Sequence, residues 1–225
     1  MSSRVGSWLI LIMSVAVLLS GCAGSSKQAT EMQRLRARAA YERGLSYIRD
    51  KQASLALAAL QEAISIDGTV VEYRNTLGLL FLEIRRPDLA LEQFRKATEL
   101  NPLSGESHLN MGIALAEMAR WAEAVGAYRK ALTAPTLPTP HVAHQNLGLA
   151  LYHLKSYDEA ETALRFAISL EPELEAAYYN LGLVLIARGR MDEAKLALRR
   201  ARDLAPESPF GQAALQKLRA LGEGG

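Results

Sequence analysis

The chain has 225 residues, of which 49% are hydrophobic, 22% are charged and 6% are aromatic, and its formal net charge is +2. Abundant alanine and leucine with few aromatic residues favour helices over sheets. A nearly neutral chain has no positive field to attract phosphates, which argues against nucleic acid as a partner. The single cysteine, Cys22, excludes an internal disulfide and a cysteine metal cluster.

Residues 1–21 are organised like a lipoprotein signal peptide. Arg4 supplies a positive charge, and the apolar stretch from Trp8 to Leu19 is too short to span a membrane comfortably. It leads into Leu19-Ser20-Gly21-Cys22, which resembles a bacterial lipobox. The resemblance implies cleavage before Cys22, attachment of a diacylglycerol to its thiol, and acylation of the new amino terminus with palmitate or a similar chain. Two or three acyl chains anchor a protein stably, whereas one does not. The alternative is a plain secretory signal with an accidental cysteine.

The segment after the cysteine predicts the destination. Ala23, rather than aspartate, follows Cys22. In proteobacterial lipoproteins this resemblance implies sorting to the outer membrane, with the protein facing the periplasm of a Gram-negative bacterium. Residues 22–30 are small and polar, which indicates a lipidated tether. Four arginines follow closely, and we interpret them as a solvated helix face or, alternatively, as a contact with anionic lipid or cell wall: Arg34, Arg36, Arg38 and Arg43.

A repeat of about 34 residues runs through the remaining chain. Its glycines are separated by 34, 34, 36 and 34 residues and stand at Gly44, Gly78, Gly112, Gly148 and Gly182. Each glycine is followed at fixed distances by two alanines with a bulky residue between them, as in Ala160, Leu164 and Ala167. This pattern resembles the tetratricopeptide repeat (TPR), a pair of antiparallel helices. Small residues suit the places where helix backbones approach closely, and large residues fill the spaces between them.

We therefore predict an all-α fold, a right-handed TPR solenoid over residues 31–221. The repeats are expected at about 37–70, 71–104, 105–140, 141–174 and 175–206, followed by a capping helix at 207–220. The helix pairs are expected at 36–50/53–66, 71–84/87–100, 105–118/121–133, 141–154/157–170 and 175–188/191–204. The proline-rich linker from Thr133 to His141 is two residues longer than its counterparts, so we expect a stiff, exposed elbow there.

The predicted functional site is the concave groove lined by the first helices of the repeats. Apolar residues recur there on one helical stripe, with asparagines beside them. An asparagine amide both donates to and accepts from a peptide backbone, so this surface suits an extended or helical peptide. Alternatively, the asparagines bond within their own helix pairs, and the stripe is covered by the solenoid's curvature or by self-association. The expected groove residues are Asn75, Leu79, Leu109, Asn110, Ile113, Asn146, Leu149, Tyr152, Tyr179, Asn180, Leu183 and Ile186.

No motif for catalysis, phosphate binding or dinucleotide binding occurs in the sequence. The histidines are His108, His141, His144 and His153, and no nearby carboxylate or cysteine completes a metal-ligand set. His108 and His144 occupy a packing position of the repeat and are expected to be half-buried. We therefore expect no enzyme activity, catalytic residue, metal, cofactor or small-molecule substrate.

A narrower resemblance comes from three features together. They are the lipobox, a mature chain almost wholly made of TPRs, and a proline-rich junction, APTLPTP, ahead of Asn146-Leu147-Gly148. The combination resembles the TPR lipoproteins of type IV pilus assembly, the PilF/PilW/Tgl type, often called pilotins. This resemblance implies a protein that escorts the pilus secretin to the outer membrane and promotes its oligomerisation, with a secretin subunit as partner. The alternatives are a periplasmic adaptor for cell-wall enzymes and an accessory of outer-membrane protein assembly.

Overall fold

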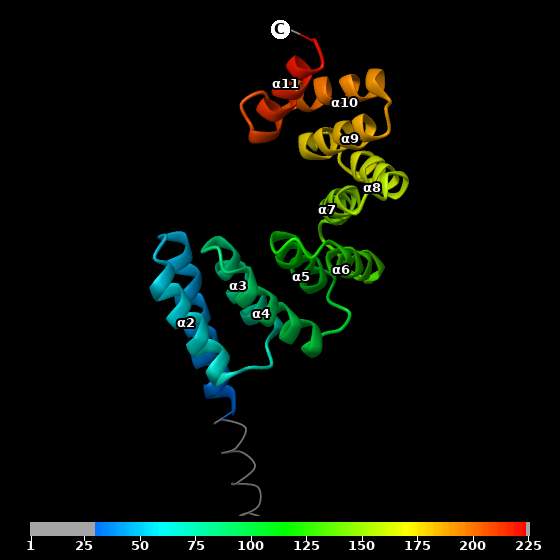
Figure 1. Cartoon of the computed structure of the whole chain (residues 1–225). Helices are drawn as coiled ribbons and strands as arrows, with labels where there is room; N and C mark the ends of the chain where they lie inside the picture. Colours follow the sequence, from blue (N-terminus) through cyan, green and yellow to red (C-terminus); the bar gives the residue numbers. More distant parts are fainter. Residues whose placement is uncertain (1–29, 224–225) are drawn as a thin grey trace, which may run out of the picture. The chain divides into compact units, whose positions relative to one another are not determined.

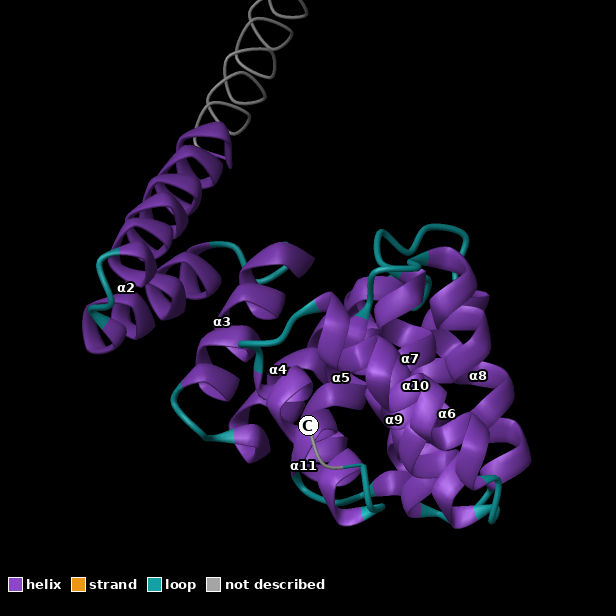
Figure 2. Ribbon diagram, turned by 90° about the horizontal axis from the view of Figure 1, so that it is seen from above, coloured by secondary structure: helices purple, strands orange, loops and turns teal. Residues whose placement is uncertain are grey.

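The computed structural model describes residues 30–223, which form two compact units, residues 30–73 and 74–223. The described chain is helical, and its only extended pairing is one isolated bridge (Figure 2). The signal peptide, Cys22 and all but the last residue of the predicted tether lie outside the described residues. None of the described helices is long and apolar enough to cross a membrane.

The first unit contains a helix over residues 30–49, the helix α2 (Ala53–Ile66) and the start of α3 (Val71–Glu83). It is held by a buried cluster of small and aromatic residues, namely Ala37, Ala40, Ala63 and Tyr73. The first helix is already formed at residue 30, whereas the sequence led us to expect its start at 36. Residues 31–38 (EMQRLRAR) are mostly strong helix formers, so the helix extends beyond its packed part.

The second unit is an array of helix pairs. Its helices pack in sequence order, α5 on α6, α7 on α8 and α9 on α10, and each pair packs on the next (Figure 1). The observed bounds lie close to the predicted ones, which confirms the predicted helix pairs. The helices that follow α3 are α4 (Pro87–Leu100), α5 (Gly105–Glu117), α6 (Trp121–Thr133), α7 (Pro140–His153), α8 (Tyr157–Leu170), α9 (Glu175–Ala187), α10 (Met191–Leu204) and α11 (Pro209–Ala220).

Packing within a pair follows the predicted exchange of small and large residues. In α7 and α8, Gly148 faces Leu164, and a Cβ atom at Gly148 would lie 2.5 Å from Leu164 Cγ and 3.2 Å from the Ala160 carbonyl oxygen. Ala160, Leu164 and Ala167 are all fully buried. The repeat glycine therefore marks a helix crossing, as the sequence predicts.

Each first helix ends in the same left-handed turn. In the fourth repeat the Lys155 N–H donates to the Tyr152 carbonyl at 2.9 Å, and the Ser156 N–H donates to the Leu151 carbonyl at 3.0 Å. These two bonds form a Schellman motif, whose key residue has positive φ. The key residues are Lys51, Arg85, Ala119 and Lys155, with φ between 56° and 61°, and Gly189 with φ 74°.

The elbow between α6 and α7 packs against the start of α5. Thr136 pairs with Ser104 in an isolated parallel bridge. A Cβ atom at Gly105 would lie 2.8 Å from the Thr136 carbonyl oxygen, so only glycine leaves room for this approach. The expectation of an exposed elbow is right for Pro135, Thr136 and Pro138, but the loop is anchored rather than free.

Candidate protein-binding groove

The predicted groove residues, all in the second unit, fall into two groups that differ in burial. The half-buried or exposed ones are mainly apolar, and they offer surface to a partner: Leu79, Ile113, Asn146, Leu149, Tyr152, Tyr179, Leu183 and Ile186. The remaining four are buried: Asn75, Leu109, Asn110 and Asn180. The apolar stripe and the row of asparagines therefore do not form one surface.

The buried asparagines belong to the packing between repeats. Asn75 Oδ1 accepts a hydrogen bond from Ser107 Oγ at 3.1 Å, which joins α3 to α5. The side-chain nitrogens of Asn110 and Asn180 are buried and have no hydrogen-bond partner among the described residues. Asn146 alone is half-buried, and its Oδ1 accepts from Gln145 Nε2 at 3.2 Å. Of the four asparagines in the predicted groove, only Asn146 is accessible to a partner while the chain stays folded.

A pocket of about 290 Å³ lies between the first helices α5 and α7, with α6 behind them. Three predicted groove residues, Ile113, Asn146 and Leu149, line it together. Tyr128 forms its floor, and burial raises the pKa of the Tyr128 phenol, so this group stays neutral. The pocket thus combines apolar walls with the Asn146 amide, a combination that takes an apolar side chain and one backbone hydrogen bond.

Trp121 completes this pocket, and our sequence analysis missed it. Trp121 begins α6, a second helix, and its ring stacks on His153 with centroids 3.9 Å apart and planes 7° apart. The stacking fixes the indole at the pocket edge. Its signal in the sequence was its rarity, since the chain has two tryptophans. Aromatic side chains held rigidly at a pocket edge are frequent anchors of protein interfaces.

The C-terminal end of the stripe is partly covered by the capping helix α11. Tyr179 and Ile186 pack against a buried cluster formed by Leu198, Ala201, Ala214 and Leu218. The Tyr179 ring also lies 5.8 Å from the ring of Phe210. Burial raises the pKa of the Tyr179 phenol. The accessible part of the stripe is therefore centred on α5 and α7.

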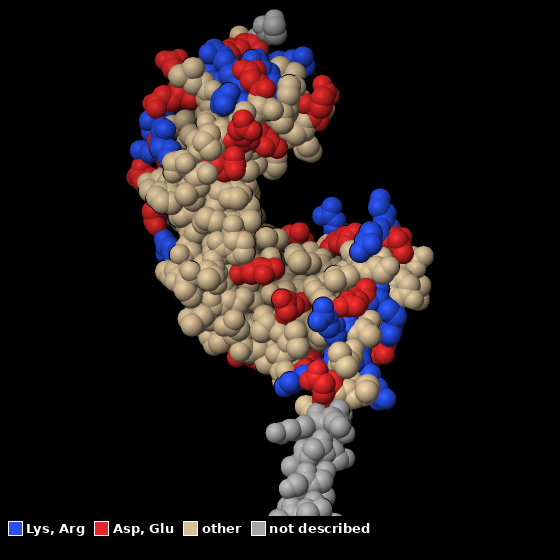
Figure 3. All heavy atoms as spheres, turned by 180° about the vertical axis from the view of Figure 1, so that it is seen from behind, with Lys and Arg blue, Asp and Glu red and all other residues tan. Residues whose placement is uncertain are grey.

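Charge is unevenly distributed over the second unit. In Figure 3, Lys, Arg, Asp and Glu side chains gather over the C-terminal helices, whereas a broad surface below them is mainly uncharged. Glu117 is the one ionisable carboxylate among the residues that line the pocket between α5 and α7. The lining of this pocket therefore offers mainly apolar contact rather than ion pairing.

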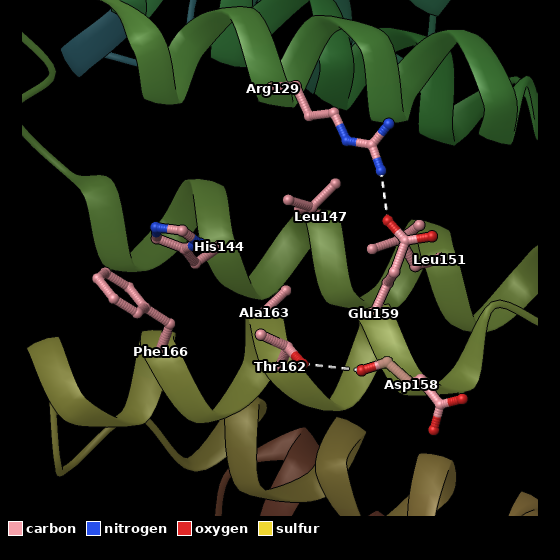
Figure 4. A pocket seen from close by; sticks show the side chains of 9 residues that line it. All are labelled: Arg129, His144, Leu147, Leu151, Asp158, Glu159, Thr162, Ala163 and Phe166. Atoms are coloured by element: carbon pink, nitrogen blue, oxygen red, sulfur yellow. Dashed lines mark hydrogen bonds and ion pairs between the residues drawn. The ribbon is translucent and has the colours of Figure 1, made fainter.

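A second pocket, of about 370 Å³, lies between α6 and α8 with α7 at its base (Figure 4). Leu147, Leu151 and Ala163 form its apolar floor. An ion pair of 2.5 Å between Arg129 and Glu159 crosses one end, and the rings of His144 and Phe166, 4.5 Å apart, close the other. No predicted groove residue lines this pocket. Arg129 and Glu159 pair with each other, and Asp158 pairs with Arg188 outside the pocket, so each charged group of the lining already has a partner.

The histidines take packing roles. His108, expected to be half-buried, is buried, and its Nε2 lies 3.0 Å from the Pro102 carbonyl oxygen. His144 is half-buried as expected, and burial lowers its pKa, which keeps the ring neutral. Within residues 30–223, no group of three His, Cys, Asp or Glu side chains is placed to hold a metal ion.

Comparison with known proteins agrees with this architecture. The family model of the tetratricopeptide repeat matches residues 75–138 and 146–209, more than half of the chain. The chain is 32% identical over 128 residues to the type IV pilus assembly protein PilF of Pseudomonas aeruginosa, a match that covers 55% of this chain and 50% of PilF. The chain therefore spans about half the length of this curated relative.

Solved structures extend the likeness over most of the chain. The crystal structure of PilW, a widely conserved type IV pilus biogenesis factor, matches with a TM-score of 0.75 and 23% identity, covering 83% of this chain and 86% of PilW. YrrB, a TPR protein with an unusual peptide-binding site, matches with a TM-score of 0.66 and 18% identity, covering 84% of this chain and 97% of YrrB. At these identities the structural likeness shows the fold alone.

Proposed function

Because the chain belongs to the tetratricopeptide-repeat family, we propose that it binds a protein partner through the groove centred on α5 and α7, without catalysis. The partner is a secretin subunit of a type IV pilus, and the chain is a pilotin that promotes secretin localisation and oligomerisation. The observation that carries this proposal is the pocket in which Ile113, Asn146 and Leu149 meet Trp121. The names of PilF and PilW, which refer to pilus assembly and biogenesis, support the choice of partner.

The proposal includes a lipid anchor at Cys22 in the outer membrane, facing the periplasm. Its support is the lipobox that ends at Cys22 and the alanine that follows it. Growth with labelled palmitate should label the native protein and not a Cys22→Ser variant. Equal labelling of both would reject the anchor while leaving the groove as a possible binding site.

The groove is tested with a double variant, Leu149→Ala/Tyr152→Ala, whose two side chains are half-buried on α7. Truncation of interface anchors typically costs about 2 kcal/mol or more, so we expect binding to a purified secretin domain to weaken at least about thirtyfold. Tyr179 is left unchanged because it also packs against α11. Leu196→Ala on α10, an exposed leucine outside the groove, is the matched control and should bind normally.

The same variants separate the possible functions in cells. The double variant should be present at normal levels yet lose assembled secretin oligomers and surface pili. Normal oligomers in the double variant would reject the groove as the working site. Normal oligomers in a strain lacking the gene would reject the pilotin role and favour an adaptor for cell-wall enzymes or outer-membrane protein assembly.

A further inference from the structure

The first two turns of the helix over residues 30–49 are uncovered. Every residue from 30 to 36 is exposed, and Ala37 is the first to be buried. Met32 and Leu35, which are 51% and 53% exposed, are large apolar side chains on this uncovered part. A helical turn without packing is marginal in water, so an apolar, uncovered helix start indicates a surface that covers it.

The exposed apolar residues of the segment 30–39 lie on one side of this helix. At about 100° per residue, Met32, Leu35 and Ala39 lie on a different side of the helix from the buried residues Ala37 and Ala40. The exposed arginines Arg36 and Arg43 follow one edge of the apolar side, and Arg38 follows the other. An apolar stripe between basic edges is the arrangement of helices that lie on anionic membrane surfaces.

The local charge agrees with this interpretation. Residues 30–38 contain three arginines, at 34, 36 and 38, and one acidic residue, Glu31, which leaves a charge of +2. Further along, Arg38 forms an ion pair of 2.9 Å with Glu42, and Arg43 forms one of 2.6 Å with Glu62. The net positive charge is therefore concentrated in the uncovered turns, nearest to the N-terminus.

We propose that residues 30–39 lie on an anionic phospholipid surface, with Met32 and Leu35 at the boundary between headgroups and acyl chains and the arginines against phosphates. This inference rests on the proposed anchor at Cys22. Cys22 precedes residue 30 by eight residues, which span at most about 28 Å when extended. A lipid on Cys22 would hold the helix start close to the bilayer, and this proximity raises the effective concentration of a contact that is weak alone.

The test uses the full-length protein with a single fluorescent label on Leu35→Cys, since lipidation blocks the thiol of Cys22. The matched control carries the label on Gly126→Cys in α6, where an added side chain meets open space. Both proteins are mixed with excess vesicles that contain brominated lipid, made of phosphatidylcholine alone or mixed with phosphatidylglycerol. We expect the label at 35 to be quenched in the anionic vesicles, and the label at 126 to remain unquenched.

Two charge variants test the arginines. Each arginine near an anionic surface contributes about a fivefold gain in affinity, so Arg34→Gln/Arg36→Gln/Arg38→Gln should reduce quenching at 35 at least about tenfold at limiting lipid. Arg95→Gln/Lys130→Gln/Arg219→Gln removes the same charge from exposed positions of the second unit and should leave quenching unchanged. Circular dichroism should show equal helix content in both variants.

The outcomes of anchoring and docking are read separately. The mass of each protein reports whether Cys22 carries lipid. A mass without lipid would reject the anchor, and the label at 35, studied with Cys22→Ser added, would still report docking at excess vesicles. Two outcomes would overturn the lipid contact. One is that the label at 35 shows no more quenching than the label at 126, and the other is that both charge variants lose the same amount of quenching at 35. The cell wall is the alternative contact. If the protein sediments with purified peptidoglycan and only the Arg34→Gln/Arg36→Gln/Arg38→Gln variant fails to do so, the arginines contact the cell wall and the membrane contact is rejected.

Discussion

At the residue scale, the helix pairs depend on glycine, which has no side chain, at the points where the two helices cross. A side chain at Gly148 would overlap Leu164, which is fully buried, and would crowd the Ala160 carbonyl oxygen of the facing helix. We expect Gly148→Val and Ala160→Leu each to lower the free energy of unfolding by about 1–3 kcal/mol. Urea unfolding measures this change. Gly126→Ala is the control, because its added methyl meets open space on a helix, and it should be neutral or stabilising.

Glu161 connects the fourth repeat to the fifth. Its side chain on α8 is 10% exposed, and its carboxylate accepts hydrogen bonds from Arg165 at 2.8 Å and from Arg190 at 2.7 Å. Arg188 also pairs with it. Burial alone raises the pKa of Glu161, but the hydrogen bonds from Arg165 and Arg190 outweigh burial, so the pKa lies below its ordinary value of 4.5.

This depressed pKa gives the stability a defined pH dependence. Because the folded state binds the Glu161 proton more weakly than the unfolded state, the contribution is complete above pH 4.5 and is lost as pH falls through the lower, folded pKa. We expect Glu161→Gln to cost about 1–3 kcal/mol at pH 7, a figure discounted for the partly exposed arginines. The free energy of unfolding of this variant should also decrease less on acidification than that of the wild type, because the variant has no carboxylate at position 161 to protonate. Glu173→Gln, an exposed carboxylate, should behave as wild type, and identical pH profiles of all three proteins would contradict this account.

At the element scale, the capping helix α11 protects the last repeat. Leu218 is 1% exposed and packs on Leu198 and Ala201 of α10. Leu218→Ala should lower the free energy of unfolding by about 2–5 kcal/mol, whereas Leu196→Ala, at a leucine that is 61% exposed, should cost little. Amide hydrogen exchange should accelerate first in α9 and α10, because neighbouring repeats stabilise each other locally. Uniform acceleration from α4 to α11 would contradict a local role.

The bounds of the helices could be predicted closely because the same sequence pattern recurs in every repeat. Proline, glycine and alanine recur at fixed positions, so a helix end that is unclear in one repeat can be placed by comparison with the next repeat. The contacts of the connecting segments could not be predicted. The bridge from Thr136 to Ser104 joins residues far apart in sequence, and it depends on how closely the elbow approaches Gly105. The cover that α11 places over Tyr179 likewise depends on its docking against α9.

At the scale of the whole molecule, the predicted all-α TPR fold is confirmed, and the predicted groove stays a proposal. The periodic pattern predicts which helix side faces the groove, but it could not give the depth of each residue. Asn110 and Asn180 are buried, whereas Asn146, at the equivalent position of its repeat, is only half-buried. The pocket beside Phe166 escaped prediction because its walls come from helices on both sides of the elbow. Depth and pockets arise between repeats, where a single-repeat pattern carries no information.

The left-handed turns have a consequence for how this chain can change over generations. Four of the five turns hold a residue with a side chain, Lys51, Arg85, Ala119 or Lys155, where glycine would adopt the same backbone at lower energy. Each such residue carries a penalty of roughly 1 kcal/mol. The penalties lie in separate repeats, so each can be relieved by one substitution. A lineage can thus recover stability lost to mutations elsewhere, one turn at a time, while the surface of the proposed groove is free to diverge.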